Sequence, residues 1–345
     1  MEGTRVAEVT AGMVRSPVFV TILALAGAVV SPDVSIAAAA HRRAHRPAHS
    51  APVIFEVPAA TRLMVVAPHP DDEMLGAGGL MQRVLETGGT VRIVYLTDGD
   101  GYPEGVQTED RVRSPTANDY RGYGRQRRRE ARAALAALGF GPSKYSYTFL
   151  SFPDGGLCKL TRTYWSERRA AYRSPYTRLD RPPKSEILVP DTEYRGEDLT
   201  QELAQIIGSF RPTLIVVPRP EDQHADHCAA WYFVADALTD VRRVSPDYNA
   251  DLLNYIVHFN TWPFEEDERR LEPPPGLRGG ASGWMKFALT AAEQRTKRAA
   301  LRRYDSQQHA MDWFLDGFAR SNEVFSRPAD TRVVLPSRRN LCCDR

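Results

Sequence analysis

The stretch VVAPHPDDEMLGAGGL, residues 65–80, decides the fold and indicates where the chemistry lies. It continues an apolar, β-branched run that begins at residue 62, and such a run is typical of a buried strand. One histidine and three consecutive acids follow the run, and side chains of both kinds are common metal ligands. We therefore expect a strand that ends in a group of metal-binding side chains, which are His69, Asp71, Asp72 and Glu73.

Strand-like and helix-like segments alternate on either side of this stretch. Four further apolar runs fit strands, at residues 90–97, 144–152, 213–218 and 251–259. Apolar residues with helical spacing lie between them, at residues 76–89, 124–141 and 197–210. Strands and helices that alternate with short links favour an α/β fold, with a mostly parallel, Rossmann-like sheet and helices on both faces.

A second group of polar side chains follows the fourth predicted strand. The segment RPEDQHADH places His224, Asp226 and His227 where the next helix is expected to begin. Ligands of open α/β sheets bind beyond the carboxyl ends of the strands, so the two groups can converge on one ion. Two histidines, one carboxylate and an open position form the ligand set of hydrolytic zinc, and a spare carboxylate can act as general base. The residues themselves leave open whether Asp71 or Asp72 is the ligand.

Each motif also has a purely structural interpretation. The sequence HPDDE fits a solvated turn, and HADH fits a helix start with its caps. These interpretations do not explain why both motifs stand at strand ends of one α/β chain. We therefore favour a metal site.

The motifs APHPDDEMLGAGG and HADH together resemble the PIG-L/LmbE-like family of zinc-dependent N-acetylglucosaminyl de-N-acetylases. Further similar segments are TDGDG, RRRE followed by LG, FPDGGL and KRAALRRYDSQ, so the resemblance runs from about residue 62 to residue 325. It implies a metal-dependent amide hydrolase that removes an N-acetyl group from an N-acetylglucosamine-type sugar or glycoconjugate. It also implies one Zn²⁺ per chain, and Fe²⁺ suits the same ligands.

The resemblance assigns the metal and the base to particular residues. His69, Asp72 and His227 are the implied metal ligands, and Asp71 is the implied general base. Glu73 is interpreted as a charge at the helix amino terminus, where the helix dipole favours an anion.

The resemblance also assigns acid and substrate-binding roles. His224 is the implied acid or oxyanion-stabilising group, oriented by Asp226, while Arg127 and Asp154 would hydrogen-bond sugar hydroxyls. A surface arginine and a turn aspartate remain the alternative for the last two. Asp222 stands where the mycothiol branch of the family has a tyrosine, so a tyrosine is not expected to stabilise the oxyanion here.

The first forty residues have the order of a secretory signal. Basic residues precede the 13-residue apolar run VFVTILALAGAVV, and AAAA follows it. A bilayer-spanning helix needs about 20 apolar residues, which makes an uncleaved anchor the weaker alternative. We expect a signal peptide at 1–40, a linker at 41–61, the deacetylase domain at 62–330 and a tail at 331–345. The mature protein is then exported, either periplasmic or extracellular, and meets the membrane only transiently.

The bulk composition limits the possible partners. A net charge of +2 on 345 residues does not provide the strong positive field that would attract nucleic acid. An insertion at residues 158–195 is rich in Arg, Tyr and Pro, and we interpret it either as a wall of the cleft or as a mobile surface loop. Its aromatic residues Tyr164, Trp165, Tyr172 and Tyr176 offer faces for sugar rings.

Two rival functions remain at this point. One is an amidase that acts on a non-sugar conjugate, and the other is a non-catalytic sugar-binding protein of the same fold. The pairing of the four cysteines and the oligomeric state do not follow from the sequence.

Overall fold

The computed structural model describes residues 53–54, 56–141, 143–264, 269–278 and 283–328. The expected signal peptide, most of the expected linker and the expected tail lie outside the described residues. Among the helices of the described segments, none is both long and apolar enough to cross a bilayer.

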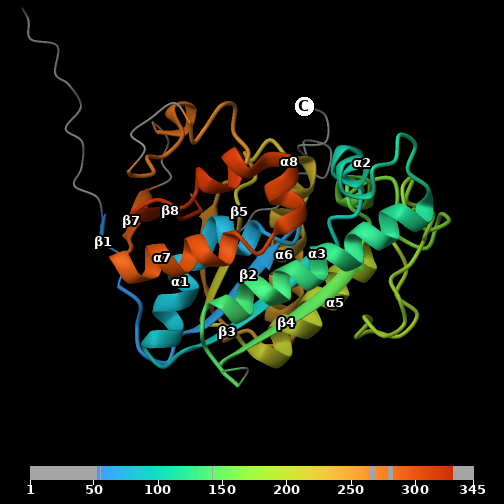
Figure 1. Cartoon of the computed structure of the whole chain (residues 1–345). Helices are drawn as coiled ribbons and strands as arrows, with labels where there is room; N and C mark the ends of the chain where they lie inside the picture. The colour runs from blue at the N-terminus through green and yellow to red at the C-terminus, as the bar shows by residue number, and fades with distance from the viewer. Residues whose placement is uncertain (1–52, 55, 142, 265–268, 279–282, 329–345) are drawn as a thin grey trace, which may run out of the picture. The chain divides into compact units, whose positions relative to one another are not determined.

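A mixed sheet with the strand order β1-β7-β8-β6-β5-β2-β3-β4 forms the centre of the described chain (Figure 1). Strands β4, β3, β2, β5 and β6 pair in parallel, whereas β8 is antiparallel to both β6 and β7. The predicted mostly parallel sheet is confirmed. The strands are β1 (Val53–Ile54), β2 (Arg62–Ala67), β3 (Thr90–Thr97), β4 (Tyr145–Phe152), β5 (Leu214–Pro218), β6 (Asp251–Tyr255), β7 (Trp284–Ala288) and β8 (Asn322–Ser326).

Helices cover both faces of this sheet, as predicted. Alternate residues of β2 divide between two cores: Leu63 and Val65 pack with α1, α3 and α7, while Met64 and Val66 pack with α5 and α6. The helices are α1 (Asp72–Glu86), α2 (Pro103–Asp110), α3 (Ala117–Ala137), α4 (Leu157–Leu160), α5 (Gly196–Phe210), α6 (Ala225–Val244), α7 (Ala291–Leu301) and α8 (Asp305–Asp316). A short 3-10 helix, η1, covers Pro275–Leu277.

Two helix starts differ from the sequence prediction. Helix α1 begins at Asp72, so the acids Asp72 and Glu73 lie in its first turn and not in a turn before it. Helix α3 begins at Ala117, seven residues before the predicted start at 124, and a capping box of Thr116 and Asp119 stabilises this earlier start. Both early starts are buried: Asp72, Glu73, Met74 and Leu75 in the first turn of α1 and Tyr120 and Tyr123 in α3 are inaccessible or nearly so, and their polar or scattered residue types hide this from the apolar pattern.

Two glycines of GAGG, Gly76 and Gly79, allow close packing of α1. A Cβ atom on Gly76 would lie 2.3 Å from the Tyr255 ring of β6. One on Gly79 would lie 2.2 Å from the Leu289 side chain. Larger residues at these two positions would push α1 away from its neighbours and move its amino terminus, which carries the acids.

A buried ion pair joins α1 to the antiparallel part of the sheet. The side chains of Lys297 in α7 and Glu323 in β8 are almost wholly inaccessible, and Nζ lies 2.6 Å from Oε1. Nζ of Lys297 also donates to the Leu75 carbonyl at 2.9 Å. The Glu323 carboxylate accepts from the backbone N–H groups of Gly79 at 2.6 Å and Leu80 at 2.9 Å. Both charges are therefore paired and hydrogen-bonded.

The insertion at 158–195 is anchored to the domain. Tyr194 is buried, and its hydroxyl donates to the Ser151 carbonyl at 2.9 Å. Trp165 stacks on Phe233 of α6 with 6.3 Å between ring centroids and 2° between planes. These contacts favour a structural wall over a loosely attached loop.

The two cysteines of the described chain are both disulfide-bonded. Cys158 lies in α4 and Cys228 in α6, and these two helices pack against each other. Cys158 follows the FPDGGL turn, and Cys228 follows His227 directly. The other cysteines, Cys342 and Cys343, lie outside the described residues.

Candidate metal centre and active site

Histidines from three neighbouring strand ends meet at the carboxyl edge of the sheet. His69 follows β2, His224 and His227 stand at the start of α6 after β5, and His258 follows β6. The ring centroids of His69 and His227 are 5.3 Å apart. The strands are adjacent in the order β6-β5-β2, which explains why residues so distant in the sequence meet.

Three side-chain atoms form the corners of a nearly equilateral triangle. Oδ2 of Asp72 lies 3.1 Å from Nδ1 of His69 and 3.1 Å from Nε2 of His227, and the two nitrogens are 3.3 Å apart. In a tetrahedral site with bonds of about 2.0 Å, two ligand atoms are about 3.3 Å apart. All three residues are buried. The residues predicted as ligands therefore have the spacing that a zinc-sized ion requires.

Carboxylates hold the other nitrogen of each ligand histidine. Nδ1 of His227 lies 3.2 Å from Oδ2 of Asp222, and Nε2 of His69 lies 3.1 Å from Oδ1 of Asp154. Burial opposes protonation of His227, but the charges of Asp222 and Asp72 raise the pKa of this imidazole to about 10. Such partners orient metal-ligating imidazoles, and an excess of carboxylates favours a bound cation. The contact of Asp222 was not predictable from its place in the sequence, where the mycothiol branch of the family has a tyrosine.

Asp226 has a different partner from the one expected. Its carboxylate accepts from the N–H groups of Gly155 at 2.7 Å and Leu157 at 3.0 Å, and it lies 3.4 Å from Nε2 of His69. It contacts His224 through its backbone N–H, which donates to Nδ1 at 3.3 Å. The expected pair of the Asp226 carboxylate and the His224 ring is therefore corrected: the carboxylate orients His69 and the turn at Gly155.

Asp71 is held beside the ligand triangle as a spare carboxylate. Nη2 of Arg127 donates to its Oδ2 at 2.9 Å and to the Pro70 carbonyl at 2.8 Å. Burial raises the pKa of Asp71 to about 7, against the opposing charge of Arg127. A general base works best when its pKa lies near the working pH. Arg127 was expected to bind a sugar hydroxyl, and its described contacts instead position the candidate base.

The backbone at Asp71 is strained. Its φ of 131° is rare for a residue other than glycine, and such strain concentrates at functional sites. Its N–H donates to Oε2 of Glu73 at 3.1 Å, and the hydroxyl of Tyr304 donates to the same carboxyl group. Burial raises the pKa of Glu73 to about 7. Glu73 thus contributes a contact that holds the Asp71 backbone in addition to its place at the helix start.

A cavity of about 390 Å³ opens over the triangle. Six predicted site residues line it, namely His69, Asp71, Asp72, Arg127, Asp154 and His224. Tyr102, Tyr176, Gln307, Met311 and Phe314 also line it. Of the four aromatic residues predicted to face the cleft from the insertion, Tyr176 lines it, while Tyr164, Trp165 and Tyr172 pack against the core under α5 and α6.

His224 and His258 are neighbouring imidazoles on one wall of this cavity. Their ring centroids are 5.3 Å apart. Burial and the charge of His69 lower the pKa of His224 to about 4. Burial and the charge of His227 lower the pKa of His258 to about 3. His258 was not among the predicted site residues, because the strand predicted at 251–259 contains it, whereas β6 ends at Tyr255 and leaves His258 beyond the strand.

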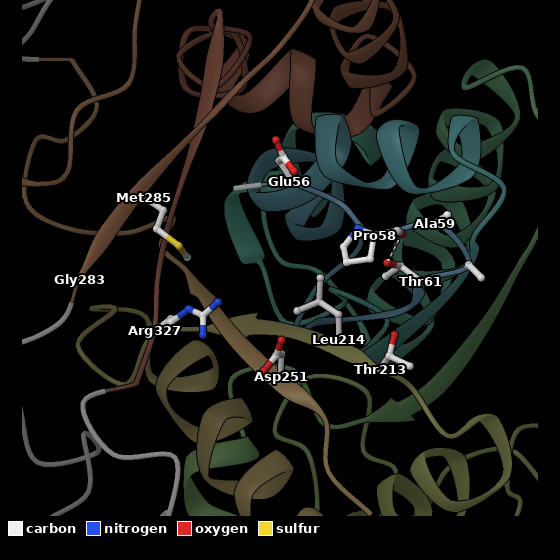
Figure 2. Close-up of a pocket in the computed structure, with 11 residues that line it drawn as sticks. Glu56, Pro58, Ala59, Thr61, Thr213, Leu214, Asp251, Gly283, Met285 and Arg327 are labelled. Atoms are coloured by element: carbon white, nitrogen blue, oxygen red, sulfur yellow. Dashed lines mark hydrogen bonds between the residues drawn. The ribbon is translucent and has the colours of Figure 1, made fainter. Parts of the chain in front are cut away.

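A second cavity, of about 650 Å³, lies at the opposite edge of the sheet (Figure 2). It is lined by residues at the amino ends of parallel strands, such as Thr61, Thr213 and Asp251. Its ionisable groups are Glu56, Asp251 and Arg327, and no histidine lines it. Open parallel sheets bind ligands at their carboxyl ends, so we place the chemistry at the smaller cavity.

Comparison with known proteins finds deacetylases among the relatives of this chain. The chain is 28% identical over 174 residues to 1D-myo-inositol 2-acetamido-2-deoxy-alpha-D-glucopyranoside deacetylase 1 of Saccharopolyspora erythraea, covering 50% of this chain and 52% of the relative. A deacetylase of the same description from a Nocardioides species is 32% identical over 199 residues, covering 55% and 57%. The chain thus spans about half the length of the curated relatives it matches.

A solved structure similar to this chain is the N,N'-diacetylchitobiose deacetylase from Pyrococcus horikoshii. It is 17% identical with a TM-score of 0.47, and the match covers 78% of this chain and 85% of that one. Residues 64–238 match the family model described as PIG-L, GlcNAc-PI de-N-acetylase. The match includes both histidine motifs and slightly more than half of the sequence, and the chain belongs to the PIG-L family.

Proposed function

We propose that this protein is a zinc-dependent hydrolase that removes an N-acetyl group from an N-acetylglucosamine-type sugar or glycoconjugate. The observation that carries the proposal is the triangle of ligand atoms with Asp71 beside it. A protein that only binds sugars has no need for a second, strained carboxylate held by a buried arginine. Fe²⁺ suits the same three ligands and is the alternative metal.

Each residue of the site has a separate role in the reaction. His69, Asp72 and His227 would hold a divalent metal, which when bound polarises an amide carbonyl and lowers the pKa of water. Asp71 takes a proton from the attacking water as its oxygen bonds to the acetyl carbon. The carbon–nitrogen bond then breaks. The proton that Asp71 took from water passes through His224 to the departing nitrogen, so Asp71 ends the cycle ionised and His224 ends it neutral, as they began. One water is consumed, and one amine and one acetate are released.

The activity is tested with the purified protein and a panel of N-acetylated substrates. We expect equal amounts of acetate and free amine from an N-acetylglucosamine conjugate, and no release from N-acetylated peptides. Release from a peptide or another non-sugar amide alone would favour the rival amidase function. Saturable sugar binding without any release would favour the binding protein.

Tyr176 is expected to contribute to substrate binding and not to metal binding. Its ring lines the cavity and contacts Tyr120 with 5.2 Å between centroids. An aromatic face against an apolar sugar face adds about 0.5–1.5 kcal/mol, so Tyr176→Ala should raise KM about 2- to 10-fold with zinc content unchanged. Leu188→Ala is the matched control, because Leu188 is exposed in the same insertion and does not line the cavity. An equal KM for both variants would show that Tyr176 does not contribute to substrate binding.

We further propose that the protein is exported after cleavage near Ala40. Disulfides persist in oxidising compartments and are rare in the cytosol, so the bonded state of Cys158 and Cys228 supports this proposal. Mass spectrometry of protein secreted by an expressing bacterium should find a chain that begins near residue 41, with at least two thiols fewer than the fully reduced chain. A chain that begins at Met1 or Met13 would contradict the proposal.

A further inference from the structure

His258 is a residue of the cavity that the reaction above does not use. Its backbone N–H donates to Oδ2 of Asp222 at 3.1 Å, and the same oxygen lies 3.2 Å from Nδ1 of His227. One buried carboxylate therefore fixes both a ligand histidine and the chain at His258. The His258 ring lies almost parallel to the Phe314 ring, with 5.3 Å between centroids and 10° between planes. The position of this imidazole is held from two sides.

The ring stands beside the ligand triangle. A ring nitrogen of His258, a carboxylate oxygen of Asp72 and a ring nitrogen of His227 all lie within 4.8 Å of one another. The rings of His258 and His227 meet edge to face, with 4.9 Å between centroids. No hydrogen bond or ion pair joins the His258 ring to another side chain of the described segments, and the ring lines the cavity. Its polar atoms are thus available to a bound substrate.

Hydrolysis of an amide needs hydrogen-bond donors at two places at once. The carbonyl oxygen gains negative charge as water adds, and the nitrogen needs a proton as its bond to carbon breaks. One N–H group of His224 cannot serve both atoms in the same step. Asp71 and Arg127 are joined to each other as the candidate base and its partner, and the His224 and His258 rings stand 5.3 Å apart and line the same cavity. Two adjacent imidazoles match the two atoms that need donors.

We propose that His258 donates a hydrogen bond to the oxyanion that forms on the acetyl carbonyl, which leaves His224 to protonate the departing nitrogen. This inference rests on the proposed function and adds a residue to it. No bond to His258 forms or breaks, and its N–H keeps its proton throughout. This role requires an N–H donor on the His258 ring and does not require the ring to carry a positive charge.

The test compares His258→Phe, which removes the donor but keeps an aromatic ring beside Phe314, with His258→Gln, which restores an N–H group. Loss of one oxyanion donor lowers kcat by about 10²- to 10³-fold, and we expect this loss for His258→Phe with KM nearly unchanged. His258→Gln should recover part of kcat. Zinc affinity, measured by competition with a chelator, should equal that of the wild type in both variants. His309→Phe is the matched control, because His309 is exposed on α8 and bonded to Glu109 outside the cavity.

A second readout does not depend on turnover. The product acetate presents a carbonyl-derived oxygen to the same donor, so calorimetry should show weaker acetate binding to zinc-loaded His258→Phe than to the wild type. Unchanged kcat and unchanged acetate affinity would overturn the assignment. A fall in zinc affinity would overturn it too, because His258 would then be a metal ligand. A wild type that releases no acetate from any sugar would contradict the proposed function. The acetate-binding comparison would still test whether His258 donates a hydrogen bond to the bound oxygen.

Discussion

Asp71→Asn is expected to abolish most turnover while the protein keeps its metal. The amide preserves the shape of the carboxylate but cannot accept a proton from water, and general bases contribute about 10²- to 10⁴-fold to a rate. Asp71 lies outside the ligand triangle, and Arg127 holds its carboxylate at 2.9 Å. Metal content should therefore remain near one zinc per chain, as measured by elemental analysis beside kcat.

Asp72→Asn is the matched variant at the neighbouring residue. The Asp72 oxygen lies 3.1 Å from both ligand nitrogens, and an amide oxygen is a poorer ligand than a carboxylate. This variant should lose zinc, and excess zinc should restore part of its activity. If Asp71→Asn loses the metal and Asp72→Asn keeps it, the two roles are reversed. If both variants hydrolyse N-acetyl sugars at the wild-type rate, the proposed enzyme mechanism is wrong.

Lys297→Met is expected to produce the largest loss of stability among substitutions outside the site. It leaves the carboxylate of Glu323 buried without its cation, and breaking a buried pair in this way costs about 3–5 kcal/mol. The Glu323 carboxylate also binds two N–H groups of α1, so the loss should loosen the helix that carries Asp72. Urea denaturation followed by circular dichroism measures the change in the free energy of unfolding.

A matched control and a double variant separate the contribution of the ion pair to stability from that of side-chain packing. Lys286 and Glu272 form an ion pair whose side chains are 31% and 36% exposed, so Lys286→Met should cost about 1 kcal/mol or less. Replacing both Lys297 and Glu323 with apolar residues should recover much of the stability, because no uncompensated charge remains. Equal losses for Lys297→Met and Lys286→Met would show that the buried pair contributes little.

The parallel half of the fold was predictable because its strands are buried on both faces. Strands β2, β3 and β5 are nearly continuous apolar runs, and their sequences show this directly. Strands β1, β7 and β8 were missed, and β1 falls within the predicted linker at 41–61. The sequence WMKFA contains a lysine, and NEVFS begins with Asn322 and Glu323, whose polar groups are satisfied by contacts distant in sequence. A buried charge appears in a sequence as a surface residue until its partner is known.

Prediction of the site from the sequence was limited in the same way, by contacts between residues that are distant in the sequence. Residues that stand directly after buried strands could be identified, because the end of a parallel strand fixes where its next side chains lie. The contacts of Arg127, Asp154 and Asp226 could not be predicted, since each depends on which side chain another segment brings near. The same rule did not reach His258, because the predicted strand at 251–259 contains this residue, whereas β6 ends at Tyr255.

Zinc titration of the metal-free protein tests the central claim most directly. The protein is stripped with a chelator, zinc is added in known amounts, and acetate release from an N-acetylglucosamine conjugate is followed. Three ligand atoms 3.1 to 3.3 Å apart provide one site, so activity should rise in proportion to zinc and reach its plateau at one zinc per chain. Full activity in the stripped protein, or a protein that binds one zinc and releases no acetate, would contradict a zinc-dependent deacetylase.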